Sequence, residues 1–579
     1  MRRFGVITLA LLLLALLGMP APPAQAQAPA PKVTLGGTFD VVNSALWNIS
    51  QVDADFTRAS DTIWISRQRT TLVALGEVEK ARGVLAFELD LGWGMTGPGG
   101  TGVVPAVAPQ MAFSTGTAMG ASNDVVNVLE VKQMYVEFPV PLVPWPTTLR
   151  LGGQPGAGTL QYKPVVYFDD FPGVYFVTTL TPAVKFHFLY SQHDEDAFGC
   201  NKTKPGKEAR ESGSCGSLGV NLAQTTLRTS FQRGDDFVMG ASLDVTPIKG
   251  LDVRPFYAYW YQKGIFQNSQ NTTLPTSGIG GVNTSTALGS DQAKREWHYV
   301  GLDARWRSGP FSFDPTFIYL FGTNLYACTG LNRNAGDCGR QVNAAGVTVD
   351  ETTKQDVRAW MVDLRGGWRM GPLLLEGFAL YVPGNDARDN MGNTAGAIRE
   401  QRFFQPINTG GGYAAGWSNF FTSNEIDFLR AYSIGSSVAR GSVITYDRYG
   451  AVVLSLKPSY ALTRALTLKG LVAGNWTAED VDTHGVFAAA TGWTPETGRS
   501  ARPKDAARDG DDNFLGAELA AGLTWAFAPG LTFDVGVSHL IAGDALEQCK
   551  NALVAGVCQT DKRDARDASG VAARVRFAF

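Results

Sequence analysis

The chain has 579 residues, with 50 Lys and Arg against 53 Asp and Glu, 66 Gly and 11% aromatic residues. Its net charge of −3 excludes the strongly basic surface expected of a nucleic-acid-binding protein. A chain of this length usually forms two or more soluble domains. No Pro/Ser-rich linker or shift in composition divides it, however, and plentiful Gly and aromatic residues with modest charge favour a single β-protein.

Residues 1–26 are predicted to be a secretory signal peptide. Arg2 and Arg3 give a basic start, residues 6–17 are largely apolar, and Ala24-Gln25-Ala26 is a small-x-small cleavage site. After this segment the sequence has no uninterrupted apolar run of about 18 or more residues, so a membrane-spanning helix is not expected. We expect residues 27–579 to form one mature domain.

Segments of about ten residues with alternating apolar and polar side chains recur through that domain. Residues 514–527 and 531–541 are the clearest pair, joined by a turn at Ala528-Pro529-Gly530. Alternating segments separated by turn residues are the sequence pattern of outer-membrane β-barrels. We predict eighteen strands, with sixteen or twenty as alternatives: 33–42, 61–76, 83–94, 127–138, 147–154, 174–181, 183–190, 236–246, 250–262, 294–307, 311–320, 355–370, 373–382, 442–456, 464–476, 514–527, 531–541 and 571–579.

The predicted fold class is all-β, a transmembrane antiparallel up-and-down barrel. With both ends in the periplasm the strand number is even, short turns face the periplasm and long loops face outside. Segment 225–233 also resembles a strand, but counting it would invert every later hairpin, so we assign it to an outer loop. A soluble β-sandwich or propeller is the alternative. The absence of a repeat of about 40 to 50 residues disfavours a propeller.

Residues 571–579 end the chain with strict alternation. Val571, Val575, Phe577 and Phe579 share one apolar face, and two arginines lie on the other. A terminal phenylalanine on such a strand resembles the signature of bacterial outer-membrane proteins, which the barrel-assembly machinery reads. The resemblance implies that Phe579 is an assembly signal and that the protein lies in the outer membrane of a Gram-negative-type bacterium. Outer-membrane lipid and lipopolysaccharide are then expected partners.

Six cysteines form three close pairs, each within one polar loop. We predict nearest-neighbour disulfides, which an oxidising periplasm permits; a metal site is the alternative, but no pair is a C-x-x-C and histidine is sparse nearby. The pairs are Cys200 with Cys215, Cys328 with Cys338, and Cys549 with Cys558.

Charged residues on the non-lipid face are predicted to line the pore. Most of the basic ones fall toward the periplasmic mouth, and rings of Arg or Lys favour anions. The alternative is that they pair with Asp252, Asp303, Asp314, Asp363 and Asp534 and simply fill the barrel wall. The predicted pore-lining residues are Arg150, Lys185, Arg254, Arg305, Arg307, Arg365, Arg369, Lys469, Arg574, Arg576, Glu88, Asp303, Asp363 and Glu518.

The longest predicted loop, residues 383–441, contains the flexible and aromatic stretch 410–417. It could fold inward as a constriction whose aromatic side chains stack on sugar rings, or it could form an outer cap, and the sequence leaves both open. Catalysis is not expected, because the chain has no G-x-S-x-G, H-E-x-x-H, Walker or haem-attachment motif. No metal site, cofactor or nucleic-acid partner is predicted.

Residues 67–154 resemble the N-terminal third of alginate-export-like and related porin barrels. The resemblance rests on Arg67-Gln68-Arg69-Thr70-Thr71-Leu72, on the strand at 129–138 and on Leu149-Arg150-Leu151-Gly152-Gly153-Gln154. It implies an eighteen-strand outer-membrane channel with an arginine-rich conduit. Gly153 stands where that pattern has arginine, so the resemblance does not supply the substrate.

These observations favour a passive outer-membrane channel for small hydrophilic solutes with a weak preference for anions. Two alternatives remain. The first is a gated channel for export or import of an acidic, alginate-like saccharide. The second is a plugged barrel with a structural or surface-interaction role, whose loops bind a partner. The oligomeric state is left open.

Overall fold

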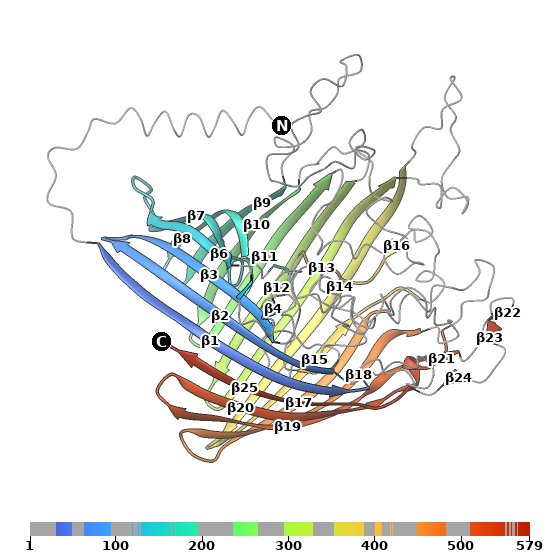
Figure 1. Ribbon diagram of the computed structural model, residues 1–579. Coiled ribbons are helices and arrows are strands. Elements are labelled where there is room, and N and C mark those ends of the chain that lie inside the picture. The colour runs from blue at the N-terminus through green and yellow to red at the C-terminus, as the bar shows by residue number, and fades with distance from the viewer. Residues whose placement is uncertain are drawn as a thin grey trace, which may run out of the picture.

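Eighteen long strands form one antiparallel barrel (Figure 1). In this computed structural model the described residues are 31–48, 63–93, 118–119, 125–126, 129–163, 165–167, 170–194, 236–263, 294–327, 352–386, 400–407, 417–418, 420, 449–481, 510–549, 553–554, 557–558, 562–563 and 565–579. The long strands are β1 (Lys32–Trp47), β2 (Ile63–Val78), β3 (Ala81–Trp93), β6 (Leu129–Pro139), β7 (Thr147–Pro155), β8 (Asp170–Thr181), β9 (Val184–Asp194), β10 (Asp236–Ile248), β11 (Leu251–Lys263), β12 (Lys294–Ser308), β13 (Phe311–Ala327), β14 (Thr352–Met370), β15 (Leu373–Val382), β17 (Ala451–Ala461), β18 (Leu466–Val481), β19 (Asp512–Ala528), β20 (Leu531–Ala542) and β25 (Ala568–Ala578).

Short elements lie in the connections. They are β4 (Ala118–Met119), β5 (Val125–Val126), β16 (Glu400–Gln401), β21 (Gln548–Cys549), β22 (Leu553–Val554), β23 (Val557–Cys558), β24 (Lys562–Arg563) and one 3₁₀ turn (Asp544–Leu546). No helix in the described part of the chain is long and apolar enough to cross a membrane.

The barrel is closed, because its first and last strands pair with each other. Each long strand is antiparallel to the next, and β25 pairs with β1 from Thr38↔Ala578 to Trp47↔Ser569. In Figure 1 the red β25 runs beside the blue β1. Both the predicted fold class and the number of eighteen strands are confirmed.

The two faces of the sheet have opposite chemistry. On the outward face, large apolar side chains are half exposed, among them Phe317 at 48% and Leu519 at 50%. On the inward face, Asp303, Asp363 and Glu518 are fully buried. A closed barrel with an apolar exterior and a charged interior satisfies every backbone group within a bilayer. The protein is an outer-membrane β-barrel of the Gram-negative type.

Tight turns join the strands at the end of the barrel where the chain begins and ends. Gly250 (φ +86°) and Gly530 (φ +73°) lie in the left-handed region. A Cβ on Gly250 would lie 2.4 Å from the Arg307 carbonyl oxygen, and one on Gly530 would lie 2.3 Å from that of Ala578. Both positions therefore require glycine for backbone conformation and for close approach of the next strand.

One strand is displaced along the chain from its prediction, whereas β1, β8, β9, β13 and β18 are extended by four to seven residues at one end. The fourteenth strand was expected at 442–456, whereas β17 runs from Ala451 to Ala461 and includes Pro458. Proline has no N–H to donate to a sheet, and the β17–β18 pairing omits Lys457 and Pro458 before it resumes at Ser459↔Lys469. The expected strand stopped at the residue before this interruption, but the structure continues past it.

Several predictions fall outside the described residues. These are the signal peptide at 1–26, segment 225–233 and the cysteines Cys200, Cys215, Cys328 and Cys338. Cys549 and Cys558 lie in β21 and β23, but their side chains are not described. The three disulfides therefore stay predictions.

The C-terminal Phe579 strengthens the pairing of β25 with β1, which closes the barrel. Its carbonyl oxygen accepts from the Gly37 N–H at 3.0 Å, and its own N–H donates to the Gly37 oxygen at 3.1 Å. Its ring stacks on Phe39 at 5.8 Å and on Phe577 at 5.6 Å between centroids. The residue therefore stabilises barrel closure, whether or not it is also an assembly signal.

Deleting Phe579 should destabilise the folded barrel by about 3 kcal/mol, since two hydrogen bonds and two aromatic contacts are lost. The urea midpoint of the refolded barrel in detergent micelles measures this loss. Phe579→Tyr, which retains the ring and the backbone bonds, is the control and should keep the midpoint. Equal midpoints for the deletion and the unmodified chain would contradict the closing role.

Candidate functional site

A segment between β7 and β8 folds into the barrel. This first inward segment comprises residues 156–163 and 165–167. The backbone N–H groups of Tyr162 and Lys163 donate to Asp303 Oδ2 at 2.8 and 2.9 Å. Asp303 is an inward-facing residue of β12 with no exposed surface. The wall of the barrel thus holds the segment through a buried carboxylate.

Lys163 joins the segment to two strands at once. Its Nζ lies 3.3 Å from Asp363 Oδ1 and 3.7 Å from Asp303 Oδ1, and it donates to the Asp314 carbonyl at 2.6 Å. Arg365 also binds Asp363, at 2.8 Å. Two cations and two carboxylates therefore form a buried, charge-balanced cluster. Burial lowers the pKa of Lys163, and the neighbouring Asp363 and Asp303 oppose this shift.

Tyr162 packs between two arginines of the wall. The guanidinium carbons of Arg254 and Arg305 lie 4.2 and 4.3 Å from its ring centroid. Its hydroxyl donates to Asp244, which also accepts from Arg254 at 2.9 Å. Burial and the hydrogen bond to Asp244 raise the pKa of Tyr162, so the phenol stays protonated and remains a donor. Cation–π contacts strengthen when they are shielded from water.

A second segment enters the barrel between β15 and β17. This second inward segment comprises residues 400–407, 417–418 and 420. It begins with β16, which pairs in parallel with β14 through Asp356↔Glu400. Further along, Tyr299 of β12 donates to the Gln405 carbonyl at 2.9 Å, and its ring meets Phe404 edge-on at 6.0 Å. The described part of loop 383–441 therefore packs against the inner face of the barrel, as expected for a loop that folds inward and not for one that forms an outer cap.

Trp417 anchors the far end of this segment. Its ring stacks on Phe378 at 5.0 Å, and Lys457 Nζ lies 3.8 Å from its centroid. The next residue, Ser418, donates to Glu518 Oε2 at 2.8 Å, and Ser455 donates to the Trp417 carbonyl. Trp417 is 5% exposed, so its ring is a packing surface and not a free platform for a sugar.

The two inward segments meet inside the barrel. The Ile407 N–H donates to the Val166 carbonyl at 2.9 Å, and both side chains are buried. One segment is fixed to the wall by hydrogen bonds and ion pairs, and the other by aromatic contacts and hydrogen bonds. Together they occupy part of the lumen and define the candidate site.

Most predicted lumen arginines have carboxylate partners. The shortest N–O distances are 2.7 Å for Arg150–Glu137, 2.9 Å for Arg254–Asp244, 2.8 Å for Arg365–Asp363, 2.8 Å for Arg574–Asp534 and 2.5 Å for Arg576–Asp40; Arg307 pairs with Asp314, and Lys469 lies 4.0 Å from Asp534. Glu88 pairs with Arg69 and Lys132 at 3.3 and 3.0 Å. This is the kind of pairing that the wall-filling interpretation expects, but two of its five carboxylates differ. Asp303 pairs with Lys163 at 3.7 Å, and Asp252 accepts from the Thr246 hydroxyl at 2.6 Å.

Three predicted cations differ from the rest. Within the described ranges, Lys185, Arg305 and Arg369 are exposed and have no carboxylate at ion-pair distance. Arg305 instead donates to the Tyr162 carbonyl at 3.1 Å. Its position beside the first inward segment places a positive charge at the narrowed part of the lumen.

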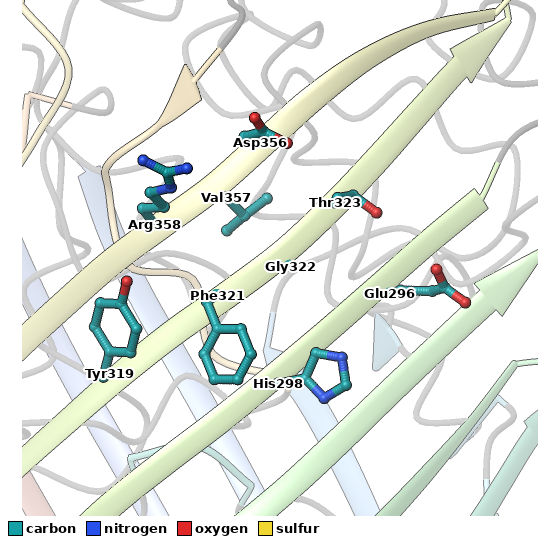
Figure 2. Close-up of a pocket in the computed structure, with 9 residues that line it drawn as sticks. All are labelled: Glu296, His298, Tyr319, Phe321, Gly322, Thr323, Asp356, Val357 and Arg358. Atoms are coloured by element: carbon teal, nitrogen blue, oxygen red, sulfur yellow. The ribbon is translucent and has the colours of Figure 1, made fainter.

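A pocket on the outside of the barrel marks the edge of the membrane-facing band. Figure 2 shows Glu296, Thr323 and Asp356 toward the outer ends of β12 to β14, and Phe321 and His298 further down. The His298 ring stacks on Phe321 at 5.0 Å, and its Nδ1 lies 2.7 Å from the Tyr257 hydroxyl. Apart from Arg358, which lies opposite Phe321 on β14, charged residues give way to an aromatic girdle here, as at a membrane–water interface.

Comparisons with known proteins are limited to distant structural likeness. No protein-family model matches the chain, and no curated protein sequence matches it. The chain is similar to the BenF-like porin of Pseudomonas fluorescens Pf-5 (8% identity, TM-score 0.43, 95% of this chain and 98% of that one). It is also similar to Pseudomonas aeruginosa OccK8 (OprE) (12%, 0.42, 95% and 98%) and OccD3 (OpdP) (11%, 0.40, 96% and 95%).

At these identities and TM-scores the likeness assigns neither family nor function. The resemblance of residues 67–154 to alginate-export-like barrels is not supported by a family model, since none matches the chain.

Sequence reasoning missed the first inward segment altogether. Tyr162 and Lys163 lie in a connection of ordinary appearance, Gly-Thr-Leu-Gln-Tyr-Lys-Pro, that has neither strand alternation nor a known motif. The only available signal was one of composition, because an outer loop rich in Leu, Tyr and Val is unusually apolar.

Proposed function

We propose that this protein is a passive outer-membrane channel for small hydrophilic solutes, with a weak preference for anions. The observation that carries the proposal is the closed barrel whose charged interior is narrowed by two wall-bound segments. Passive diffusion requires a polar path whose groups bind solutes weakly. Paired charges provide such a wall, because each carboxylate offsets the cation beside it.

The anion preference rests on the cations that lack a carboxylate partner. Arg305 and Arg369 lie on the inward face of β12 and β14 and are exposed. Lys185 adds a third positive charge on β9. A small excess of positive charge over a path of water favours anions without excluding cations. Pore lining by the other predicted residues forms part of the same proposal.

Single-channel recording in a planar bilayer tests the proposal. The refolded barrel should conduct steadily, and the reversal potential across a KCl gradient should favour chloride. A reversal potential that favours potassium would contradict the anion preference but not the proposal that the protein is a channel. A folded barrel that never conducts would contradict the channel itself.

Arg305→Gln should reduce the preference for chloride over potassium about twofold. One charge about 8 Å from a permeating ion contributes about 0.5 kcal/mol in water, with opposite sign for the two ions, and screening in about 0.1 M salt reduces each contribution to about half. The reversal potential measures this change. Arg358→Gln is the matched control, since Arg358 is an exposed arginine on the outward face of β14. An equal shift in both variants would show that surface charge, and not the lumen, sets the preference.

Two alternatives share parts of this geometry. A gated channel for an acidic saccharide would use the inward segments as its gate. Trp417, the described residue of the aromatic stretch 410–417, is buried, however, so its own ring is not free to stack on a sugar. A plugged structural barrel would also show two wall-bound segments. Current block by an acidic oligosaccharide would favour the first, and absence of conductance would favour the second.

A further inference from the structure

The outward face of β1 carries a polar residue where lipid is expected. Phe39 lies on this face, because its ring is 39% exposed and stacks on Phe577 outside the barrel. Asp40 lies on the opposite, inward face, where it pairs with Arg576. Since strand side chains alternate, Asn43 shares the outward face with Phe39.

The outward face of β2 continues this polar surface. Its outward residues include Trp64, which is 79% exposed, and Leu72, which is 43% exposed. Ser66, Gln68 and Thr70 share their parity and lie between them. The register Asn43↔Ser66 and Phe39↔Thr70 places the four polar residues in one continuous patch. We call Asn43, Ser66, Gln68 and Thr70 the polar patch.

The polar patch contrasts with the outward face of the strands that lie on the other side of β1, away from β2. Outward residues of β19, β20 and β25 are apolar over the corresponding stretch, namely Leu519, Leu523, Val535, Val537, Val571 and Val575. On β2, Trp64 lies beyond the patch toward the outside of the cell, and Leu72 lies beyond it toward the periplasm. The patch therefore lies within the membrane-facing band and not above it.

Lipid tails cannot satisfy the groups of the polar patch. Ser66 donates to Asn43 Oδ1 at 2.5 Å, and Gln68 Nε2 lies 3.5 Å from Thr70 Oγ1. An amide has two N–H donors and a carbonyl acceptor, so these contacts use only part of the hydrogen-bonding capacity of Asn43 and Gln68. Polar groups left unpaired in hydrocarbon are strongly disfavoured.

The chemistry of the patch fits a second copy of the same surface. Its residues are uncharged, so they offer no ionic attraction to a lipid phosphate or a metal ion. Amides and hydroxyls both donate and accept, so the patch is complementary to itself. Two copies inserted in the same direction present each residue at the same depth, which lets Gln68 of one copy face Gln68 of the other.

We propose that this protein forms a dimer through the outward face of β1 and β2, around a two-fold axis along the membrane normal. The polar patches of the two copies hydrogen-bond to each other across the axis, as uncharged polar side chains do between membrane segments. A two-fold axis makes the interface isologous, with the same residues on both sides. The two lumens stay separate.

Cross-linking in native outer membranes tests the dimer. Gln68→Cys should give a covalent dimer on mild oxidation. Val537→Cys is the matched control, since Val537 is 53% exposed on the outward face of β20 and should give no dimer. The unmodified chain, with six native cysteines, runs alongside. Cross-linking of Gln68→Cys no stronger than that of Val537→Cys, or only to a different protein, would overturn the proposal.

Association in lipid vesicles gives a second readout that does not depend on cysteine. Energy transfer between labelled copies should show dimers of the unmodified barrel, and Gln68→Leu should weaken association about tenfold, equivalent to about 1.4 kcal/mol. Gln68→Leu faces outward, so a heat-modified gel shift should show that its barrel still folds. A monomer at every protein-to-lipid ratio, or a trimer, would overturn the two-fold dimer.

Discussion

Replacing Lys163 with methionine should release the first inward segment and raise single-channel conductance, by about twofold or more if the lumen opens on that side. Methionine is unbranched like lysine and only one atom shorter, but it removes the charge that balances Asp303 and Asp363. Both carboxylates are fully buried, and leaving a buried charge without its partner costs about 3–5 kcal/mol. Local segments open at such energies while the rest of a structure stays folded. Single-channel recording measures the outcome.

A second substitution separates charge balance from simple loss of packing. In Lys163→Met combined with Asp303→Asn, the remaining Asp363 and Arg365 are balanced. The new amide oxygen can still accept the backbone N–H groups of residues 162 and 163. The Thr316 hydroxyl, which donates to Asp303 at 2.7 Å in the unmodified barrel, can turn to accept from the new amide. This double variant should recover most of the original conductance. Equal conductance in the single and double variants would contradict the electrostatic account.

Replacing Trp417 with alanine should have the second large effect. The substitution removes the stacking on Phe378 and the contact with Lys457, and truncation of a buried aromatic side chain costs about 3–5 kcal/mol. Two hydrogen bonds would still hold this end of the second inward segment, from Ser418 to Glu518 and from Ser455 to the backbone carbonyl of residue 417. We expect higher conductance and more frequent transitions between current levels.

The outward tryptophan Trp360 provides the matched control for this substitution. It lies on β14 and stacks on Tyr381 at 5.2 Å on the outside of the barrel. Trp360→Ala therefore deletes the same side chain without touching the lumen, and its conductance should equal that of the unmodified barrel. If Trp417→Ala also leaves the current unchanged, the second inward segment does not restrict the path.

The barrel itself could be predicted because its pattern is local. In a strand with one face toward lipid and the other toward a polar interior, apolar and polar residues alternate every two residues. Glycine and proline mark the turns between strands. The end of β17 was missed because Pro458 breaks the local pattern without ending the strand. Pairing with β15, where Pro458 lies opposite Leu375, continues through that point.

The candidate site could be predicted only in part, since it depends on contacts distant in sequence. Asp314, Asp363 and Asp534 were expected as arginine partners, whereas Glu137, Asp244 and Asp40 were not. A shift of one residue in strand register changes which face a side chain occupies, and the sequence does not give the register. Lys163 reaches Asp363 across 200 residues, a contact that no local pattern reveals.

The central claim is that small hydrophilic solutes pass through this barrel. Swelling of lipid vesicles that contain the refolded protein tests it most directly, with neutral sugars of increasing size as solutes. We predict fast swelling with the smallest sugars, a fall in rate with increasing size, and faster swelling in Lys163→Met than in the unmodified barrel. Vesicles that hold correctly folded protein and yet swell no faster than protein-free vesicles with any sugar would contradict the claim.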